Sequence, residues 1–315
     1  MIASSDRKSD TAVDVAVCTF RRPQLHETLR SIAALALPPG VSVRVIVADN
    51  DVTPSARHCV DAVREAVPFP VSYVHCPAAN ISLARNACLD NATGDFIAFI
   101  DDDATCAPGW LAGLLATARQ ANADVVLGKV VAVYPGAAPD WVRQADFHST
   151  WPVWVGGEIR TGYTGNALLR RRAGAAVGRR FDLALGQTGG EDTDFFGRLH
   201  EAGGRIAFAP DALVHETVPL ERTTLWWLAK RQFRSGQTHG RRVGERAGGP
   251  FARAVSVGIC GAKVAFCLGV ALLSVASIRR RNASLLRGVL HVGALGGLLG
   301  LREIRLYGRP QETAR

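Results

Sequence analysis

The stretch GDFIAFIDDDATCAP, residues 94–108, joins an apolar run to three consecutive carboxylates. The run at residues 96–100 is continuously apolar and predicts a buried strand. That strand would deliver Asp101, Asp102 and Asp103 at a single point. Like charges at short range raise each other's pKa and cost stability. We therefore expect a positive partner beside these three carboxylates.

Segments with strand and helix patterns alternate through the first part of the chain. Short β-type runs at residues 13–20, 41–51 and 71–76 are each followed by a segment with the apolar spacing of a helix. This alternation is typical of a mostly parallel sheet with helices on both faces. We predict a mixed α/β domain whose ligand lies beyond the carboxyl ends of the strands.

Polar side chains follow three of the predicted strands and should meet at that edge. They are Thr19, Asp49 and the carboxylates of residues 101–103. Neither a dinucleotide-binding GxGxxG nor a phosphate-binding GxxxxGK[ST] pattern follows the first strand. Clustered carboxylates suit a hard divalent cation, Mg²⁺ or Mn²⁺, that completes its shell with phosphate oxygens and water. The alternative is an acidic turn that caps the helix beginning near Pro108, although a cap needs only one carboxylate.

Beyond residue 125 the alternation is looser. We predict strands at residues 125–135 and 162–171, a strand and turn at 205–216, and a helix beginning at Glu191. The region 140–157 is rich in Trp, Gly and Pro and is expected to be irregular.

The C-terminal segment differs in composition from the rest of the chain. Residues 221–315 hold 17 of the 37 Lys and Arg residues but 4 of the 28 Asp and Glu residues. Two apolar stretches, 256–278 and 285–301, flank the sequence RRRNAS, and a full span needs about 20 apolar residues. If both spanned a membrane, the three arginines would lie on the far side, against the positive-inside rule. We expect a shallow hairpin in the cytoplasmic leaflet, with a true span or soluble helices as alternatives.

The remaining bulk features concern compartment and domain limits. The N-terminus lacks an apolar signal-peptide core, and the seven cysteines show no C-x-x-C pair. We therefore predict a cytosolic body with buried thiols in a reducing compartment. The predicted domains are a disordered N-terminus (1–11), a catalytic domain (12–220, with halves 12–124 and 125–220) and a membrane-associating tail (221–315).

Four motifs occur in the order and spacing of family 2 glycosyltransferases with the GT-A fold, which the sequence resembles over about residues 12–220. They are VAVCTFRRP, VIVADND, LARNACLDNATGDFIAFIDDD and GGEDTDF. Each motif alone is weak, but four in order are a specific signal. The resemblance is greatest to bacterial enzymes of exopolysaccharide assembly, including succinoglycan-type glucosyltransferases.

The resemblance implies roles for the residues that match these motifs. Thr19 and Asp49 would hold the nucleotide base, with Asp49 accepting the uracil N–H. Arg85 would face the nucleotide or its phosphates. Asp101 would contact the ribose, and Asp103 would bind the metal that bridges the diphosphate.

The resemblance also implies which groups would perform the transfer. Asp192 would be the catalytic base of a single in-line displacement, which inverts the anomeric centre. Glu191 would help to orient the acceptor or the neighbouring backbone, and His215 would be a further metal or phosphate contact. The implied donor is a nucleotide sugar, a UDP-hexose above others. The implied acceptor is a lipid-linked glycan at the cytoplasmic face of the cell membrane.

Two other function classes compete with this interpretation. The segment FIDDDAT also fits the nucleophile loop of haloacid-dehalogenase-type phosphohydrolases, with Asp101 as nucleophile and Asp103 as acid/base. That loop usually follows the first strand of its domain, whereas three strand–helix units precede it here. A non-enzymatic membrane-binding protein is the other alternative. We expect no nucleic-acid partner, because aromatic residues are not interleaved with the arginines of the tail.

Overall fold

The computed structural model describes residues 11–302 and 304, and the chain divides into two compact units. The predicted disorder of the N-terminal segment lies outside the described residues, except that Thr11 opens the first strand. The first unit comprises residues 11–131, 149–187 and 191–216. The second comprises residues 132–148 and 188–190 and the chain from residue 217 onward.

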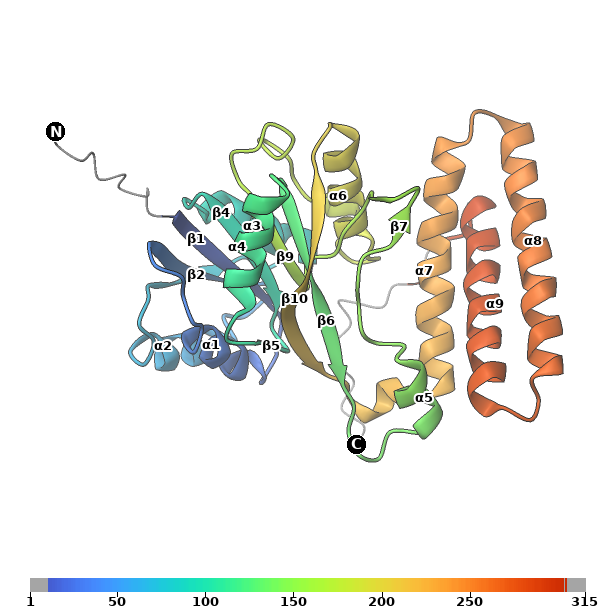
Figure 1. Ribbon diagram of the computed structural model, residues 1–315, viewed down its shortest axis with the longest axis horizontal. Helices are drawn as coiled ribbons and strands as arrows, with labels where there is room; N and C mark the ends of the chain where they lie inside the picture. Colours follow the sequence, from blue (N-terminus) through green and yellow to red (C-terminus); the bar gives the residue numbers. More distant parts are fainter. Residues whose placement is uncertain (1–10, 303, 305–315) are drawn as a thin grey trace. The chain divides into compact units, whose positions relative to one another are not determined.

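An eight-stranded mixed sheet carries the fold, in the order β3-β2-β1-β4-β9-β6-β10-β5 (Figure 1). Its parallel half contains β1 (Thr11–Thr19), β2 (Val41–Asp49), β3 (Val71–His75) and β4 (Phe96–Asp101). The other half contains β5 (Ala104–Cys106), β6 (Val125–Val133), β9 (Asn166–Arg170) and β10 (Ile206–Thr217), and β9 is antiparallel to both β4 and β6. The predicted mixed, mostly parallel α/β class is therefore confirmed.

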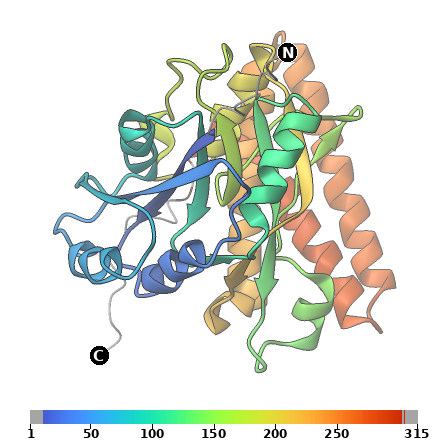
Figure 2. The same ribbon diagram turned by 60° about the vertical axis from the view of Figure 1, so that its left-hand side comes forward.

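Apolar side chains of the central strands point alternately to the two faces of the sheet. Both faces are therefore apolar, and helices cover both (Figure 2). In β1, Val13, Val15 and Val17 join one core, while Ala16 joins the other. The first core is closed by α1 (Leu25–Ala33), α2 (Arg57–Arg64) and α4 (Trp110–Gln120). The second core is closed by α3 (Ile81–Asn91) and α6 (Glu191–Glu201). Strands buried on both faces read as continuous apolar runs, as residues 96–100 do.

A buried asparagine ties β9 to its neighbours β6 and β10 and to α4. Asn166, at the start of β9, is fully buried and accepts a hydrogen bond from the Trp110 indole at 2.7 Å. Its amide nitrogen donates to the carbonyl oxygens of Lys129 and Ala212 at 3.0 and 2.8 Å. Because buried polar groups are costly unless they are paired, this network fixes where β9 begins.

Short elements occupy the region that was expected to be irregular. It contains α5 (Asp140–Ala145) and a hairpin of β7 (Trp154–Val155) and β8 (Glu158–Ile159). Two 3-10 turns, η1 (Leu183–Leu185) and η2 (Leu220–Thr223), complete the described elements. The expectation of an irregular 140–157 is thus only partly right.

Three long helices dominate the second unit: α7 (Leu225–Arg246), α8 (Pro250–Leu273) and α9 (Ile278–Leu298). The sequence RRRNAS does not separate two apolar segments, because it lies within the first turns of α9, which the Ser277 side chain caps. Among the described residues, α8 is the one helix long and apolar enough to cross a membrane.

Glycines bring α7 and α9 into backbone contact. A Cβ added at Gly240 of α7 would lie 2.0 Å from the carbonyl oxygen of Ala294, and one at Gly293 of α9 would lie 2.0 Å from that of Phe233. Gly236 and Gly297 make equally close approaches. These are reciprocal small-xxx-small faces, the arrangement that lets helices pack without large side chains between them.

A matched pair of substitutions tests this packing. Gly240→Ala should lower the free energy of unfolding by about 1–3 kcal/mol, because the helices must separate to admit the methyl group. Gly258→Ala, on α8, should raise it by up to about 1 kcal/mol, since no atom lies within 4 Å of the added Cβ and Ala is the better helix former. Urea unfolding of the chain in mild detergent, followed by helical circular dichroism, measures both. Equal responses would show that the close approach is unimportant.

Candidate active site

The carboxyl ends of three neighbouring strands form one edge of the first unit. In the register of the sheet, Thr19 lies opposite Asp49, and Cys18 lies opposite Asp101. The expectation that these strand ends are adjacent is therefore confirmed. The edge gathers polar groups because each strand becomes polar where its apolar run stops.

The carboxylates that follow β4 are held in an environment that disfavours their charge. Burial, followed by the negative charge of Asp103, raises the pKa of Asp101 to about 6 and that of Asp102 to about 7. Asp101 lies against the backbone before β9, since a Cβ at Gly165 would be 2.8 Å from its Oδ2.

Two arginines from the loop after β1 provide part of the expected positive charge. Arg22 lies 3.7 Å from Asp102 and 3.5 Å from Asp103. Arg21 pairs with Asp51 at 2.9 Å, and its hydrogen bond lowers the pKa of Asp51 to about 2. Sequence reasoning missed both arginines. Their position directly after the first strand, beside two strands with acidic ends, is the signal that could have identified them.

A buried ion pair places a third arginine near these carboxylates. The Asn80 side chain caps α3, and the helix then places Arg85 where its guanidinium donates to the Glu191 carboxylate. Arg85 is 8% exposed and Glu191 5% exposed, so the pair is shielded from water. Asp90, on the same helix as Arg85, pairs instead with Arg180 at 2.6 Å.

The positive charge of Arg85 also acts on carboxylates other than that of Glu191. Burial alone would lower its pKa, but attraction to Glu191, Asp192 and Asp101 raises the pKa above its ordinary value. Asp192 in turn contributes to raising the pKa of Asp101. The first unit therefore brings together the carboxylates of β4 and α6, which are about 90 residues apart in the sequence, around one arginine.

Asp192 and Glu191 occupy the first turn of α6 but differ in environment. Asp192 is half-buried, and its Oδ1 accepts the backbone N–H of Thr193 at 2.6 Å. Glu191 has a second carboxylate oxygen, Oε2, that is buried without a hydrogen-bond partner. Glu191 therefore interacts mainly with Arg85, and the Asp192 carboxylate is the more solvent-accessible of the two.

The turn before α6 depends on two glycines. Gly189 and Gly190 have φ angles of 84° and 91°, a region that favours glycine. Within the second unit, Arg234 of α7 donates to the carbonyl oxygen of Thr188, and the methyl group of Thr238 lies 2.7 Å from where a Cβ of Gly190 would be.

Asp49 organises the loop after β2. The side chain is completely buried, and its carboxylate accepts the backbone N–H groups of Asp51 and Ala56 and the hydroxyl of Tyr73. These contacts close the turn that follows β2. Thr19 is also buried. Direct contact of Asp49 or Thr19 with a nucleotide base stays a prediction.

His215 lies on β10, opposite Thr105 of β5, which is two residues after Asp103. Its side chain is half-buried. In the part of the chain that the structure describes, no three His, Cys, Asp or Glu side chains are arranged to hold a metal ion by themselves. A cation here would therefore need ligands from a bound molecule or from water.

Sequence comparisons identify the family. The model of glycosyl transferase family 2 matches residues 14–178. The chain is 58% identical over 302 residues to the succinoglycan biosynthesis protein ExoM of Rhizobium meliloti (strain 1021), covering 96% of this chain and 97% of that protein. It is 28% identical over 251 residues to the glucosyl-dolichyl phosphate glucuronosyltransferase of Haloferax volcanii, covering 71% of this chain and 75% of that enzyme.

Solved structures agree with the fold. The mannosyltransferase PcManGT from Pyrobaculum calidifontis, in complex with GDP-Man and Mn²⁺, superposes with a TM-score of 0.63 at 19% identity, covering 94% of this chain and 89% of that one. S. aureus TarS 1–349 in complex with UDP-GlcNAc gives 0.53 at 17% identity, covering 92% of each chain. This chain belongs to glycosyl transferase family 2 and is a glycosyltransferase with the GT-A fold.

Proposed function

We propose that this glycosyltransferase moves a hexose from a UDP-sugar, with inversion, to a lipid-linked glycan during assembly of a bacterial exopolysaccharide of the succinoglycan kind. The near full-length similarity to a succinoglycan biosynthesis protein supports the pathway class. Nucleotide sugars bound to the two solved relatives support the donor class.

One observation carries the proposal: Asp101, Asp103, Arg85 and Asp192 interact electrostatically at one edge of the sheet. A nucleoside diphosphate needs cationic groups, and an acceptor hydroxyl needs a base, so transfer requires both kinds of group near one point. The phosphohydrolase alternative fits less well. Its nucleophile loop usually follows the first strand of its domain, whereas β1, β2 and β3 all precede the strand that carries Asp101.

The residues present fit a hard divalent cation shared with the donor. All the nearby donors are carboxylate oxygens, the ligands that Mg²⁺ and Mn²⁺ prefer, and their repulsion is relieved by added positive charge. Asp103 would hold the cation and Asp101 the ribose, with His215 as a further contact. When bound, the cation would neutralise charge that develops on the leaving diphosphate. The relative that contains Mn²⁺ supports this assignment.

The chain's own residues have distinct tasks in the proposed reaction. Thr19 and Asp49 bind the base, and Arg85 supplies a fixed positive charge at the diphosphate. The Asp192 carboxylate accepts the proton of the acceptor hydroxyl as its oxygen attacks the anomeric carbon. The bond from that carbon to the phosphate oxygen breaks on the opposite side, so one displacement inverts the configuration. Glu191 holds Arg85 in place.

We also propose that the second unit associates with the cytoplasmic face of the membrane. The exposed apolar surface of α8 and the basic charge of residues 221–315 support a peripheral or re-entrant attachment. An acceptor carried on a lipid would then be presented to the transferase at that surface.

The metal-binding assignment predicts a specific loss. Asp103→Asn should weaken UDP binding in the presence of Mn²⁺ by at least about tenfold, since even outer ligands of a metal contribute that much. Exposed Asp211→Asn, on β10, is the matched control and should bind normally. Calorimetric titration with UDP, GDP and CMP, with Mn²⁺ or with EDTA, measures both. Binding that is insensitive to EDTA and to Asp103→Asn would remove the metal from the proposal.

The base assignment predicts a loss of rate rather than of affinity. Asp192→Asn should lower kcat by about 10²- to 10⁴-fold while leaving UDP affinity unchanged, because a general base acts only in the transition state. Asp194→Asn, two residues along α6, is the control; its carboxylate is paired with Arg198 at 2.8 Å. Single-turnover transfer to a lipid-linked acceptor measures the rate of both variants. Equal losses in the two would contradict the assignment.

The buried ion pair predicts that stability and function can be separated. Arg85→Met leaves the Glu191 carboxylate buried and uncompensated, and should cost about 3–5 kcal/mol of unfolding free energy. Adding Glu191→Leu should restore most of that stability by making the site apolar. Urea unfolding measures stability, and UDP titration measures function. A stable double variant that still binds UDP normally would show that Arg85 has only a structural role.

A further inference from the structure

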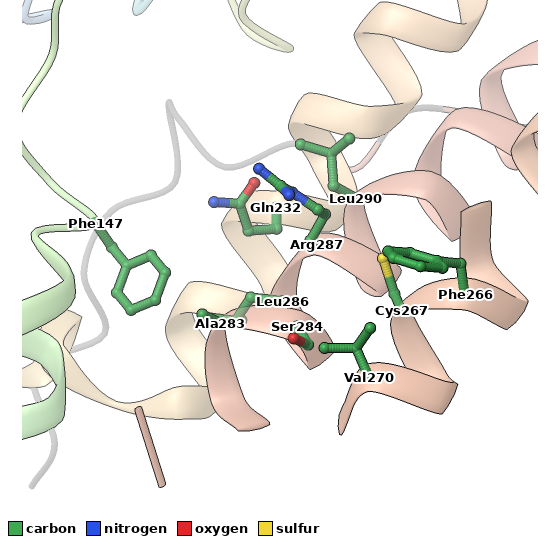
Figure 3. Close-up of a pocket in the computed structure, with 10 residues that line it drawn as sticks. All are labelled: Phe147, Gln232, Phe266, Cys267, Val270, Ala283, Ser284, Leu286, Arg287 and Leu290. Carbon is green, nitrogen blue, oxygen red and sulfur yellow. The ribbon is translucent and has the colours of Figure 1, made fainter. Parts of the chain in front are cut away.

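Two adjoining cavities lie among the helices of the second unit. They have volumes of about 430 and about 360 Å³ and share Phe266, Cys267 and Arg287. Figure 3 shows the larger one, with Phe266 and Cys267 on α8 and with Leu286, Arg287 and Leu290 on α9. The three shared residues place the two cavities side by side.

The two cavities have different chemistry. The larger is lined mainly by apolar groups, among them Phe147, Val270, Leu286 and Leu290. The smaller adds two basic side chains, Lys263 of α8 and His291 of α9. A long apolar cavity therefore adjoins a cationic one, with Arg287 between them.

The cationic cavity lacks compensating acids. Neither Lys263 nor Arg287 has an ion-pair partner within the described residues. Between residues 217 and 302 the sequence has 14 basic and 2 acidic residues, and one of the acids, Glu245, pairs with Arg241. Burial and the charges of Lys263 and Arg287 lower the pKa of His291. Like charges held together without an acid indicate a site for an anion.

The surface that surrounds the cavities is apolar. Phe266 is 70% exposed and Leu272 74% exposed, and Leu273 at the end of α8 is 90% exposed. Only Cys267 and Ala271 of this helix are buried. Exposed apolar surface on this scale marks an interaction site. A second copy of the chain is a poor occupant, because a symmetric contact would bring the two cationic clusters together.

We infer that these cavities bind a phosphate-bearing membrane lipid. Its headgroup phosphate accepts hydrogen bonds from Lys263 and Arg287, and one hydrocarbon chain lies along Phe266, Val270 and Leu290. The inference deepens the proposed membrane association by giving it a defined lipid site. It does not depend on the transferase reaction.

The test measures lipid binding by the full chain. Vesicles of phosphatidylcholine with or without about 30% phosphatidylglycerol are sedimented with the wild type, Lys263→Gln/Arg287→Gln and Arg279→Gln/Arg280→Gln. The control pair removes the same charge from the exposed start of α9. Each positive charge removed should weaken binding to the anionic vesicles by about fivefold. The cavity variant, which loses two charges, should therefore bind roughly 25-fold more weakly, and the control should lose less. Equal losses would mean general attraction to the surface and would overturn the site.

Two further measurements complete the test. The first shows whether the cavities bind a lipid or a soluble phosphate, and the second shows whether they are independent of the nucleotide site. Glycerol phosphate at millimolar concentration should not displace the vesicles, since it lacks the hydrocarbon chain; complete displacement would overturn the lipid assignment in favour of a soluble phosphate. UDP titration of the same variants should be unchanged. A wild type that binds anionic vesicles specifically but no nucleotide would reject the proposed function and leave the lipid site standing.

Discussion

The buried ion pair between Arg85 and Glu191 is the interaction on which the site depends. It joins α3, in the parallel half of the fold, to the first turn of α6, and both partners are shielded from water. A buried pair contributes little net stability compared with apolar packing, but removing one partner is costly. A contribution to stability therefore does not explain why a buried pair is present, whereas a functional role for the charge of Arg85 does. Here the arginine stays ionised beside the carboxylates of Asp101 and Asp192.

Much of the first unit could be predicted because local pattern and tertiary fold agree there. The apolar run at residues 96–100 and the alternation of strands and helices specify β4 and its neighbours without reference to distant residues. The three strand ends meet for the same reason. Glu191 and Asp192 were identified by motif, and their proximity to the β4 carboxylates follows from the family resemblance. The catalytic roles are not tested by the fold and stay predictions.

What could not be predicted depends on contacts between distant segments. Arg22 counters Asp102 and Asp103 only because the β1 loop folds over the end of β4. Asp49 accepts the hydroxyl of Tyr73, a residue 24 positions away, so this contact cannot be predicted from the motif that contains Asp49. Residues 279–284 interrupt the apolar pattern and were expected to separate two segments, but Arg and Ala are good helix formers, so one helix runs from Ile278 to Leu298.

The glycine contacts between α7 and α9 have a consequence for which substitutions this unit can tolerate during evolution. When two helices touch through their backbones, the distance between them is set by the small positions, here the four glycines of α7 and α9. Charge, length and polarity on the outer surfaces can then drift without loosening the pair. The same pair of helices can be adapted to membranes of different composition by surface substitutions alone, while the distance between α7 and α9 remains fixed.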